Sequence, residues 1–451
     1  MSITKIKQKI LQNDIAKKIT GTFLLKVISA LMSLVIGILL ARIIGVEEYG
    51  IYSYVTTIIF FLSLPAGLGL KQILVKEVAK YDTQSLWGSI FRLLKISNYL
   101  VVASSVVVVA LVVLLVQFGD KVLALDSIYI LYAGLSLIPL TLLNSHRQAA
   151  LQGLRYVVLG QLPELIIQPV LFIGFILIFY LMSSQSLNAG WTMLLKLLAV
   201  FISFVAGSIM LKKVLAIKSK NYFPNNSKML SPLTELWNMA DVIPVQSILP
   251  FMFIEGMHLI SNKTDILMLG LLTNPVEVAV YTVVSRGSQL INFVLMSVNL
   301  SLAANISSYY VRNENSKIQS LANRSAKVTF LIAGLFTVGF VLFGKYFLLL
   351  FGKEYSVGYA ALLILSIGQL LNMSSGLTGL LLNMTGHEKS TFKGVVLGST
   401  INVILNYIFI LNWGIEGAAI ATASSSVIRE IYLVLSVHRK LGIKPTIFKS
   451  I

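Results

Sequence analysis

Runs of twenty or more apolar residues recur along the whole chain, and no other feature of the sequence constrains the fold so strongly. A helix of about 20 apolar residues crosses the hydrocarbon core of a bilayer. Only 12% of the residues are charged, about half of the fraction in an ordinary soluble protein, so we expect lipid rather than water around this chain. We therefore predict an all-α integral membrane protein with twelve spans, at 21–44, 50–70, 93–117, 128–150, 157–181, 189–211, 243–272, 276–305, 328–350, 357–385, 392–411 and 414–436.

The short chain segments outside the predicted spans exclude several classes of protein. They leave no room for a folded soluble domain, which argues against a soluble enzyme, a nucleic-acid-binding protein and an ATPase with its own nucleotide-binding domain. The chain contains no cysteine, so thiol chemistry and thiolate metal sites are excluded. The four histidines are not spaced as metal ligands. We expect no metal and no cofactor, with H⁺ or Na⁺ as a coupling ion.

Positive charge is distributed unevenly between the loops on the two sides of the predicted spans. Of the 36 lysines and arginines, the loops of one side contain only Lys121, Lys345 and Lys353. Both tails and the loops of the other side, which include Lys71 and Arg147, hold nearly all the remaining loop cations. Because positively charged loops stay in the cytoplasm, we predict that both termini are cytoplasmic. The same distribution accounts for the net charge of +18 without a nucleic-acid partner.

The tails and the middle loop define the domain organisation. Residues 1–20 place isoleucines at helical spacing among lysines, which predicts a basic amphipathic helix lying on anionic membrane lipids. Residues 212–242 predict a basic cytoplasmic linker between an N-lobe at 21–211 and a C-lobe at 243–436. Residues 437–451 predict a basic cytoplasmic tail.

The two lobes contain an internal repeat. The segment LLARIIGVEEYGIYSYV (39–55) aligns without gaps with MLGLLTNPVEVAVYTVV (268–284), which places Tyr52 over Tyr281. Gly153 in LQGLRY likewise occupies the same place in its lobe as Gly386 in MTGHEK. Parallel repeats related by an axis along the membrane normal are typical of transporters. We therefore predict two pseudo-symmetric six-helix lobes around a central cavity.

Ionisable and amide side chains in span seven suggest a polar site. Glu255, His258, Asn262 and Asp265 recur at helical spacing and share one helix face. Such groups are costly in hydrocarbon and usually face a cavity or a partner. The stripe is either a packed polar seam or the lining of a cavity that binds a coupling proton or sodium ion.

Four of the cations inside the predicted spans are candidates for a site. Lys263 and Arg286 are each eleven residues from the turn at 274–275, which places them about 17 Å deep, near the bilayer midplane. Arg286 forms either a structural ion pair with Asp265 or a site for an anionic headgroup. Lys26 either snorkels to the interface or supports that site, and Lys196, like the carboxyl group of Glu164, is either in the cavity or at the interface.

Amide side chains recur in spans ten and eleven. Gln369, Asn372 and Asn383 follow one helix face in span ten, and Asn402 and Asn406 lie in span eleven. Amides with nearby glycines are typical of helix packing in membranes. The alternative is that Gln369, Asn372, Asn383 and Asn402 bind the hydroxyl groups of a glycan.

Longer stretches of the sequence resemble a known family. LLARIIGVEEYGIYSYV with LGLKQILVKEVAK (68–80), KTDILMLGLLTNPVEVAVY (263–281) and the stretch from LLNMTGHEKS to TASSSVI (381–428) resemble polysaccharide-type flippases. These belong to the multidrug/oligosaccharidyl-lipid/polysaccharide exporter superfamily. The resemblance covers nearly the whole chain.

The resemblance implies a V-shaped transporter of the bacterial cytoplasmic (inner) membrane, not an enzyme. It would flip undecaprenyl-pyrophosphate-linked oligosaccharide repeat units of O-antigen or capsule, with a polysaccharide polymerase and chain-length machinery as partners. A pyrophosphate needs cations in the cavity, and arginine pairs with phosphate oxygens bidentately. We therefore expect Arg286 to bind it, with Lys263, Lys26 and Lys196 in support. The alternatives are a lipid II flippase, a drug/cation antiporter of the same superfamily, and a membrane-embedded polymerase or ligase.

Overall fold

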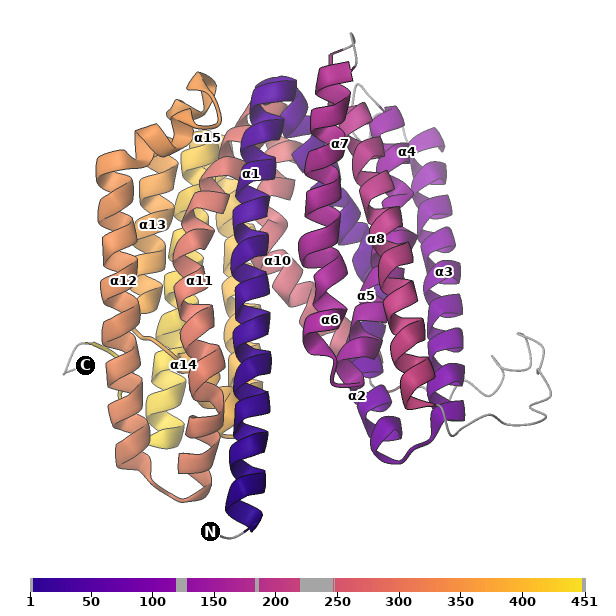
Figure 1. Cartoon of the computed structure of the whole chain (residues 1–451). Helices are drawn as coiled ribbons and strands as arrows, with labels where there is room; N and C mark the ends of the chain where they lie inside the picture. The colour runs from indigo at the N-terminus through magenta and orange to yellow at the C-terminus, as the bar shows by residue number, and fades with distance from the viewer. Residues whose placement is uncertain (1–2, 119–127, 183–185, 220–245, 247, 448–451) are drawn as a thin grey trace. The chain divides into compact units, whose positions relative to one another are not determined.

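The computed structural model describes residues 3–118, 128–182, 186–219, 246 and 248–447. Within these residues every regular element is a helix (Figure 1). Seven of the described helices are long and apolar enough to cross a membrane, which confirms a helical, multi-pass membrane protein.

The described residues form two compact units. The first unit comprises residues 1–36 and 58–256, and the second comprises residues 37–57 and 257–451. The boundary after residue 256 lies close to the predicted start of the C-lobe at 243. The middle of the first helix, however, belongs to the second unit, which the sequence did not predict.

The first unit contains both ends of α1 (Ile3–Gly67) and the helices that come before the middle of the chain. They are α2 (Leu70–Thr83), α3 (Trp87–Phe118), α4 (Ile128–Leu135), α5 (Leu137–Gly153), α6 (Val157–Leu162), the π-helical segment η1 (Pro163–Ile167), α7 (Gln168–Met182), α8 (Ala189–Lys218) and the first residues of α10 (Ile248–Leu272). The second unit adds α11 (Pro275–Val311), α12 (Asn315–Leu349), η4 (Lys353–Gly358), α13 (Tyr359–Met373), α14 (Thr378–Met384) and α15 (Glu388–Leu441).

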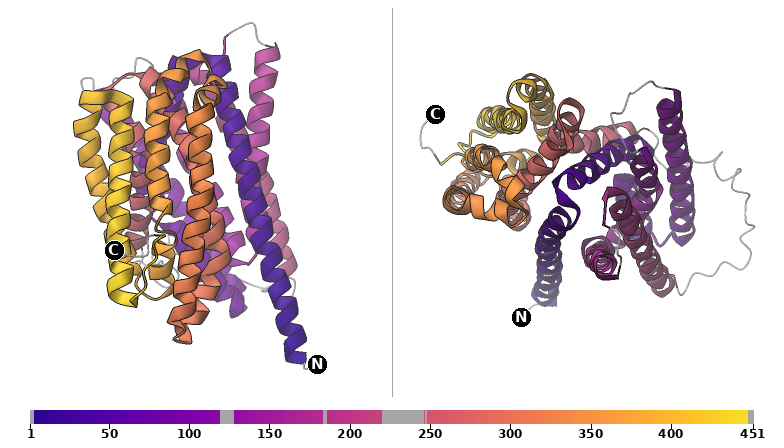
Figure 2. Two further views of the ribbon diagram at one scale, coloured as in Figure 1. Left: turned by 90° about the vertical axis from the view of Figure 1, so that its left-hand side faces the viewer. Right: turned by 90° about the horizontal axis from the view of Figure 1, so that it is seen from above.

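The two longest helices each bend at a glycine. Gly45 in α1 has φ 81°, and Gly414 in α15 has φ 52°, a left-handed conformation that glycine adopts without steric cost. In α15 the bend folds the helix back on itself. This is evident from a hydrogen bond between its two halves, in which Asn402 Nδ2 donates to Ser425 Oγ at 3.2 Å. The two halves run side by side in the left view of Figure 2. Sharp bends at 45 and 413–414 therefore replace the predicted loops.

Three predicted spans are interrupted. The span predicted at 128–150 breaks at Ser136, and the span at 157–181 contains the π-helical turn that begins at Pro163, where proline lacks the N–H needed for the helical ladder. The span at 357–385 ends its first helix at Met373 and resumes at Thr378. Gly376 lies in this break with φ 66°, and a Cβ there would approach the Ala326 Cα to 3.0 Å.

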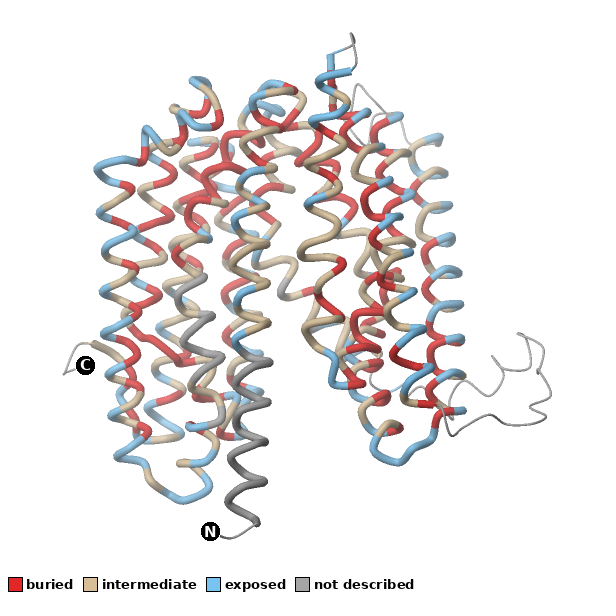
Figure 3. Tube along the Cα trace, viewed as in Figure 1, coloured by how far each residue is buried: buried red, intermediate tan, exposed pale blue. Residues whose placement is uncertain are grey.

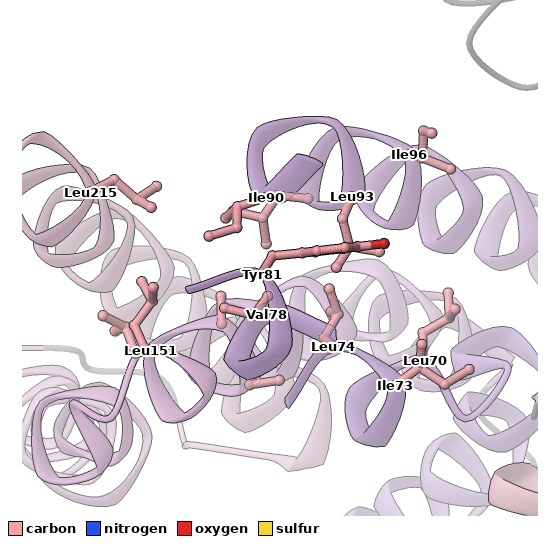
Figure 4. Close-up of a cluster of buried hydrophobic side chains, with 14 of the residues drawn as sticks. Leu70, Ile73, Leu74, Val78, Tyr81, Ile90, Leu93, Ile96, Leu151 and Leu215 are labelled. Carbon is pink, nitrogen blue, oxygen red and sulfur yellow. The ribbon is translucent and has the colours of Figure 1, made fainter. Parts of the chain in front are cut away.

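The core of the first unit is assembled around α2. Buried residues of α2 belong to one hydrophobic cluster with residues of α3, α5 and α8, part of which Figure 4 shows in close-up; the labelled side chains are Leu70, Ile73, Leu74, Val78, Tyr81, Ile90, Leu93, Ile96, Leu151 and Leu215. Lys218 at the end of α8 also binds Asp82 at 2.7 Å. The predicted cytoplasmic loop after span two thus contains a packed amphipathic helix.

The C-terminal segment of the second unit packs back onto its helices. Gln319 of α12 donates to the Lys444 carbonyl at 2.7 Å and accepts from its N–H at 2.8 Å. The N–H of Ile447 donates to the Ser374 carbonyl at 3.0 Å, and Ile443 is buried. Residues 443–447, within the predicted basic tail, are therefore part of the packed structure.

Gly50 provides a test of packing within the second unit. A Cβ at this position would lie 1.8 Å from the carbonyl oxygen of Pro275, and backbone cannot move aside as a side-chain end can. We expect Gly50→Ala to destabilise the protein by about 1–3 kcal/mol, measured as a lower thermal unfolding temperature in detergent. Gly174→Ala, where a Cβ meets no atom within 4 Å, is the matched control and should not lower it.

Candidate functional site

A polar cavity lies inside the second unit. Its volume is about 430 Å³, and α10, α11, α13, α14 and α15 contribute to its wall. The polar residues that line it are Ser261, Asn262, Asp265, Ser285, Ser288, Gln289, Asn292, Gln369, Asn372, Thr378, Thr422, Ser426, Arg429 and Glu430. Each of these hydroxyl, amide and charged groups is costly to bury without a partner.

Asp265 on α10 is held by hydrogen bonds at the wall of this cavity. Its Oδ2 accepts from the Tyr281 hydroxyl at 2.6 Å and from Thr422 Oγ1 at 3.4 Å. Its Oδ1 accepts from the backbone N–H of Ile266 at 3.2 Å. The side chain is 8% exposed. These donors come from α10, α11 and α15, so the carboxyl group joins three helices.

A chain of amides extends this network into α15. Asn406 Nδ2 donates to Asn402 Oδ1 at 3.0 Å, and Asn402 Nδ2 donates to Thr422 Oγ1 at 3.2 Å. Thr422 in turn donates to Asp265. The structure thus connects Asn402 to the carboxyl group through Thr422.

The row of amide side chains predicted on one face of span ten is only partly present. Gln369 and Asn372 line the cavity, and Gln369 Oε1 and Asn372 Oδ1 are buried acceptors without a hydrogen-bond partner among the described residues. Asn383 is exposed on α14 and is not among the cavity's lining residues. The break at Gly376 ends the helical register of α13, so Asn383 does not continue the helix face that carries Gln369 and Asn372.

The sequence analysis did not identify several other residues of the wall, including Thr422 and Arg429. Ser285, Ser288, Gln289 and Asn292 follow one face of α11, and their helical spacing is a signal that the sequence contains. Glu430 lies in the middle of the last span, where its carboxylate accepts hydrogen bonds from Ser375 at 2.7 Å and from Thr378.

Arg286 on α11 lies among aromatic side chains of the same unit. Its guanidinium carbon is 5.9 Å from the Tyr49 ring centroid, and its charge also acts on Tyr355. Gly37 makes room for it, since a Cβ at 37 would lie 2.2 Å from Arg286 Nη1. The hydroxyl group of Tyr281 donates a hydrogen bond to Asp265 at 2.6 Å.

The remaining members of the predicted stripe are divided between the units. Asn262 is exposed and lines the cavity, and Lys263 is half-buried with its charge acting on Asp265. Glu255 belongs to the first unit, where the charge of Lys71 acts on it. The side chain of His258 lies outside the described residues.

The first unit contains its own half-buried cations. Lys26 on α1 and Lys196 on α8 are both half-buried. Glu164, at the start of the π-helical turn, lies within range of the charges of Lys71 and Arg147.

The placement of Arg147 in a cytoplasmic loop was wrong. It is 4% exposed, and its Nη1 donates to the Phe204 carbonyl of α8 at 2.7 Å. Gly207 leaves space for the guanidinium group, since a Cβ there would lie 2.2 Å from Arg147 Cζ. Arg147 is therefore a buried residue of α5 that ties this helix to α8.

Comparison with known proteins agrees with this architecture. A family model described as polysaccharide biosynthesis protein matches residues 15–303, and the MatE family model matches residues 250–408. The chain is 22% identical over 426 residues to the probable low-salt glycan biosynthesis flippase Agl15 of Haloferax volcanii, covering 93% of this chain and 82% of that protein. It is 29% identical over 186 residues to the probable flippase AglR of the same organism, covering 41% of this chain and 39% of AglR.

Solved structures share the fold. An inward-facing multidrug resistance MATE family transporter of the MOP superfamily superposes with a TM-score of 0.69 at 17% identity, covering 92% of this chain and 94% of that one. The lipid II flippase MurJ in an inward closed conformation superposes with a TM-score of 0.68 at 14% identity, covering 92% and 86%. Because its family model spans well over half of the sequence, this chain belongs to the polysaccharide biosynthesis protein family, and it has the fold of the MOP-superfamily transporters.

Proposed function

We propose that the protein is a flippase that moves a lipid-linked oligosaccharide across a membrane by alternating access. Both named relatives are probable flippases, and the fold is that of membrane transporters. The protein is accordingly a transporter rather than an enzyme. The protein must provide polar partners for the oligosaccharide headgroup, because the polar groups of the headgroup cannot cross hydrocarbon unpaired.

The observation that carries this proposal is the polar cavity of the second unit. Its wall offers both donors and acceptors of hydrogen bonds, and the buried acceptors Gln369 Oε1 and Asn372 Oδ1 have no partner among the described residues. Sugar hydroxyl groups donate and accept in the same way. An apolar drug would leave these buried groups unsatisfied, at a cost of about 1–3 kcal/mol for each.

The headgroup phosphate supplies the second part of the proposal. We assign Arg286 and Lys263 of the second unit, with Lys26 and Lys196 of the first, as the cations that pair with it. The specific cargo we propose is an undecaprenyl-pyrophosphate-linked O-antigen or capsule repeat unit. It would be flipped in the cytoplasmic membrane by twelve spans in two six-helix lobes, with both termini inside and with a polysaccharide polymerase and chain-length machinery as partners.

Coupling to an ion gradient completes the proposed cycle. Asp265 is the group we assign to bind H⁺ or Na⁺, because it is a buried carboxyl group with three hydrogen-bond donors from three helices. Asn262 lines the same cavity. Glu255 and His258 are further candidates on α10.

Three observations favour alternative cargoes. The match of residues 250–408 to the MatE model and the likeness to a multidrug transporter favour a drug/cation antiporter. The likeness to MurJ favours lipid II. Each alternative predicts a different substrate in the same assay.

The test is a flipping assay in vesicles that contain the purified protein. A defined lipid-linked oligosaccharide with a fluorescent sugar is placed in both leaflets, and a membrane-impermeant quencher reports how fast the inner pool reaches the outside. We expect flipping of this lipid and none of a fluorescent drug cation. Flipping of lipid II alone, or transport of the drug cation alone, would contradict the assignment; vesicles without protein are the control.

A further inference from the structure

One face of α12 is cationic at its beginning and apolar along the rest of its length. Its first part carries Lys317, Ser320 and Arg324, which lie three or four residues apart and so share a face. The same spacing continues through apolar residues: Val328, Leu331, Leu335, Val338 and Leu342. The helix thus presents a short cationic and hydroxyl-bearing stretch that leads directly into a long apolar one.

The cationic stretch borders a cavity between α11 and α12. Its volume is about 460 Å³, and Tyr309 and Leu302 of α11 complete its wall opposite Lys317, Ser320 and Arg324. The Lys317 Nζ lies 5.6 Å from the Tyr309 ring centroid. The wall therefore combines positive charge with apolar surface.

Charge in this cavity is not balanced by the acid beside it. Lys317 Nζ lies 2.9 Å from Glu314 Oε1, but this is an exposed pair three residues apart, of a kind that contributes little free energy. Arg324 lies about two turns further along α12, is exposed, and adds a second positive charge. The net charge of the three groups favours an anion.

The apolar stretch is exposed over its whole length. Leu331, Leu335 and Leu342 are 66%, 71% and 62% exposed, and exposed positions recur along α12, at the left of Figure 3. In a membrane protein such a face contacts lipid chains. It begins where the cationic cavity ends.

We propose that this face of α12 is a binding site for one anionic glycerophospholipid, which goes beyond the proposed flipping of a glycan. The phosphate binds Lys317, Arg324 and the Ser320 hydroxyl group in the cavity, and an acyl chain lies along Val328 and the leucines that follow. Basic pockets between membrane helices bind anionic headgroups in this way. The predicted orientation places the cavity at the cytoplasmic leaflet.

Lipid titration with native mass spectrometry of the detergent-purified protein tests the site. Dioleoyl phosphatidylglycerol should bind more tightly than dioleoyl phosphatidylcholine, whose headgroup carries no net charge. Because each cation near an anionic lipid contributes roughly a fivefold gain in affinity, the Lys317→Gln/Arg324→Gln variant should lose roughly 25-fold. These side chains are exposed, so the variant should fold normally, as its unfolding temperature will show.

The matched control removes two exposed cations elsewhere in the same unit. Arg439→Gln/Lys440→Gln changes the net charge equally at the end of α15 and should leave phosphatidylglycerol binding unchanged. An equal loss in this control would show that total charge, and not this cavity, governs binding. Displacement of the phosphatidylglycerol by an equimolar polyprenyl phosphate would assign the cavity to the transported lipid instead and overturn the proposal.

Discussion

Replacing Gly37 with alanine should abolish most flipping activity while leaving the protein folded. The new Cβ would lie 2.2 Å from Arg286 Nη1, and this atom is the far end of a flexible side chain that can move aside. The guanidinium group would then leave its place above Tyr49. If Arg286 pairs with a phosphate, the lost interaction is worth about 1.5–3 kcal/mol, or about ten- to hundredfold in rate.

Three companion variants make this result interpretable. Arg286→Ala should lose as much activity as Gly37→Ala, and Arg286→Lys should recover only part of it, because lysine cannot pair bidentately. Gly339→Ala introduces a Cβ that meets no atom within 4 Å and should keep full activity. Normal flipping of the defined lipid-linked oligosaccharide by well-expressed Arg286→Ala protein would remove Arg286 from the proposed site.

The second large effect is expected at Asp265. Asp265→Asn preserves the shape of the side chain and removes its negative charge, so a bound cation loses its main partner. We expect flipping driven by a proton or sodium gradient to fall by about tenfold or more, since a charged hydrogen-bonded partner contributes about 1.5–3 kcal/mol. The measurement compares the rate in vesicles with and without an imposed gradient.

Tyr281→Phe separates charge from packing at this site. It removes the hydroxyl group that donates to Asp265 at 2.6 Å and keeps the buried ring. We expect a smaller loss than in Asp265→Asn, because the carboxyl group retains its charge. An Asp265→Asn protein that responds to the gradient as strongly as the unmodified protein would move the coupling site elsewhere.

Hydrophobic patterning predicted the positions of the helices well, because burial in lipid depends on composition over about 20 residues. Some positions that the internal repeat aligns also occupy similar places in the structure. Gly45 aligns with Asn274, and these residues mark the bend of α1 and the start of α11. Gly153 and Gly386 both lie where one helix ends and another begins.

Hydrophobic patterning did not predict local helix breaks or the hydrogen-bond partners of individual side chains. Asn383 was assigned to a polar face because a continuous helix was assumed, and the break at Gly376 depends on contact with Ala326 of another helix. Arg147 was counted with the cytoplasmic cations because its partners are carbonyl groups of α8, which a charge count does not register. The partners of Asp265 were missed for a similar reason, since Tyr281 and Thr422 have no charge and lie on other helices, and Thr422 is 157 residues further along the chain.

The assignment of residues 37–57 to the second unit determines what a carboxyl-terminal fragment of this chain would lack. The segment supplies Tyr49 to the surroundings of Arg286, and Arg42, whose guanidinium group donates to the carbonyls of Leu349 and Leu350 at the end of α12. A polypeptide that began after the central linker would lack both residues. Expressed alone, the carboxyl-terminal half of the chain would therefore be an incomplete second unit, because residues 37–57 come from the amino-terminal half.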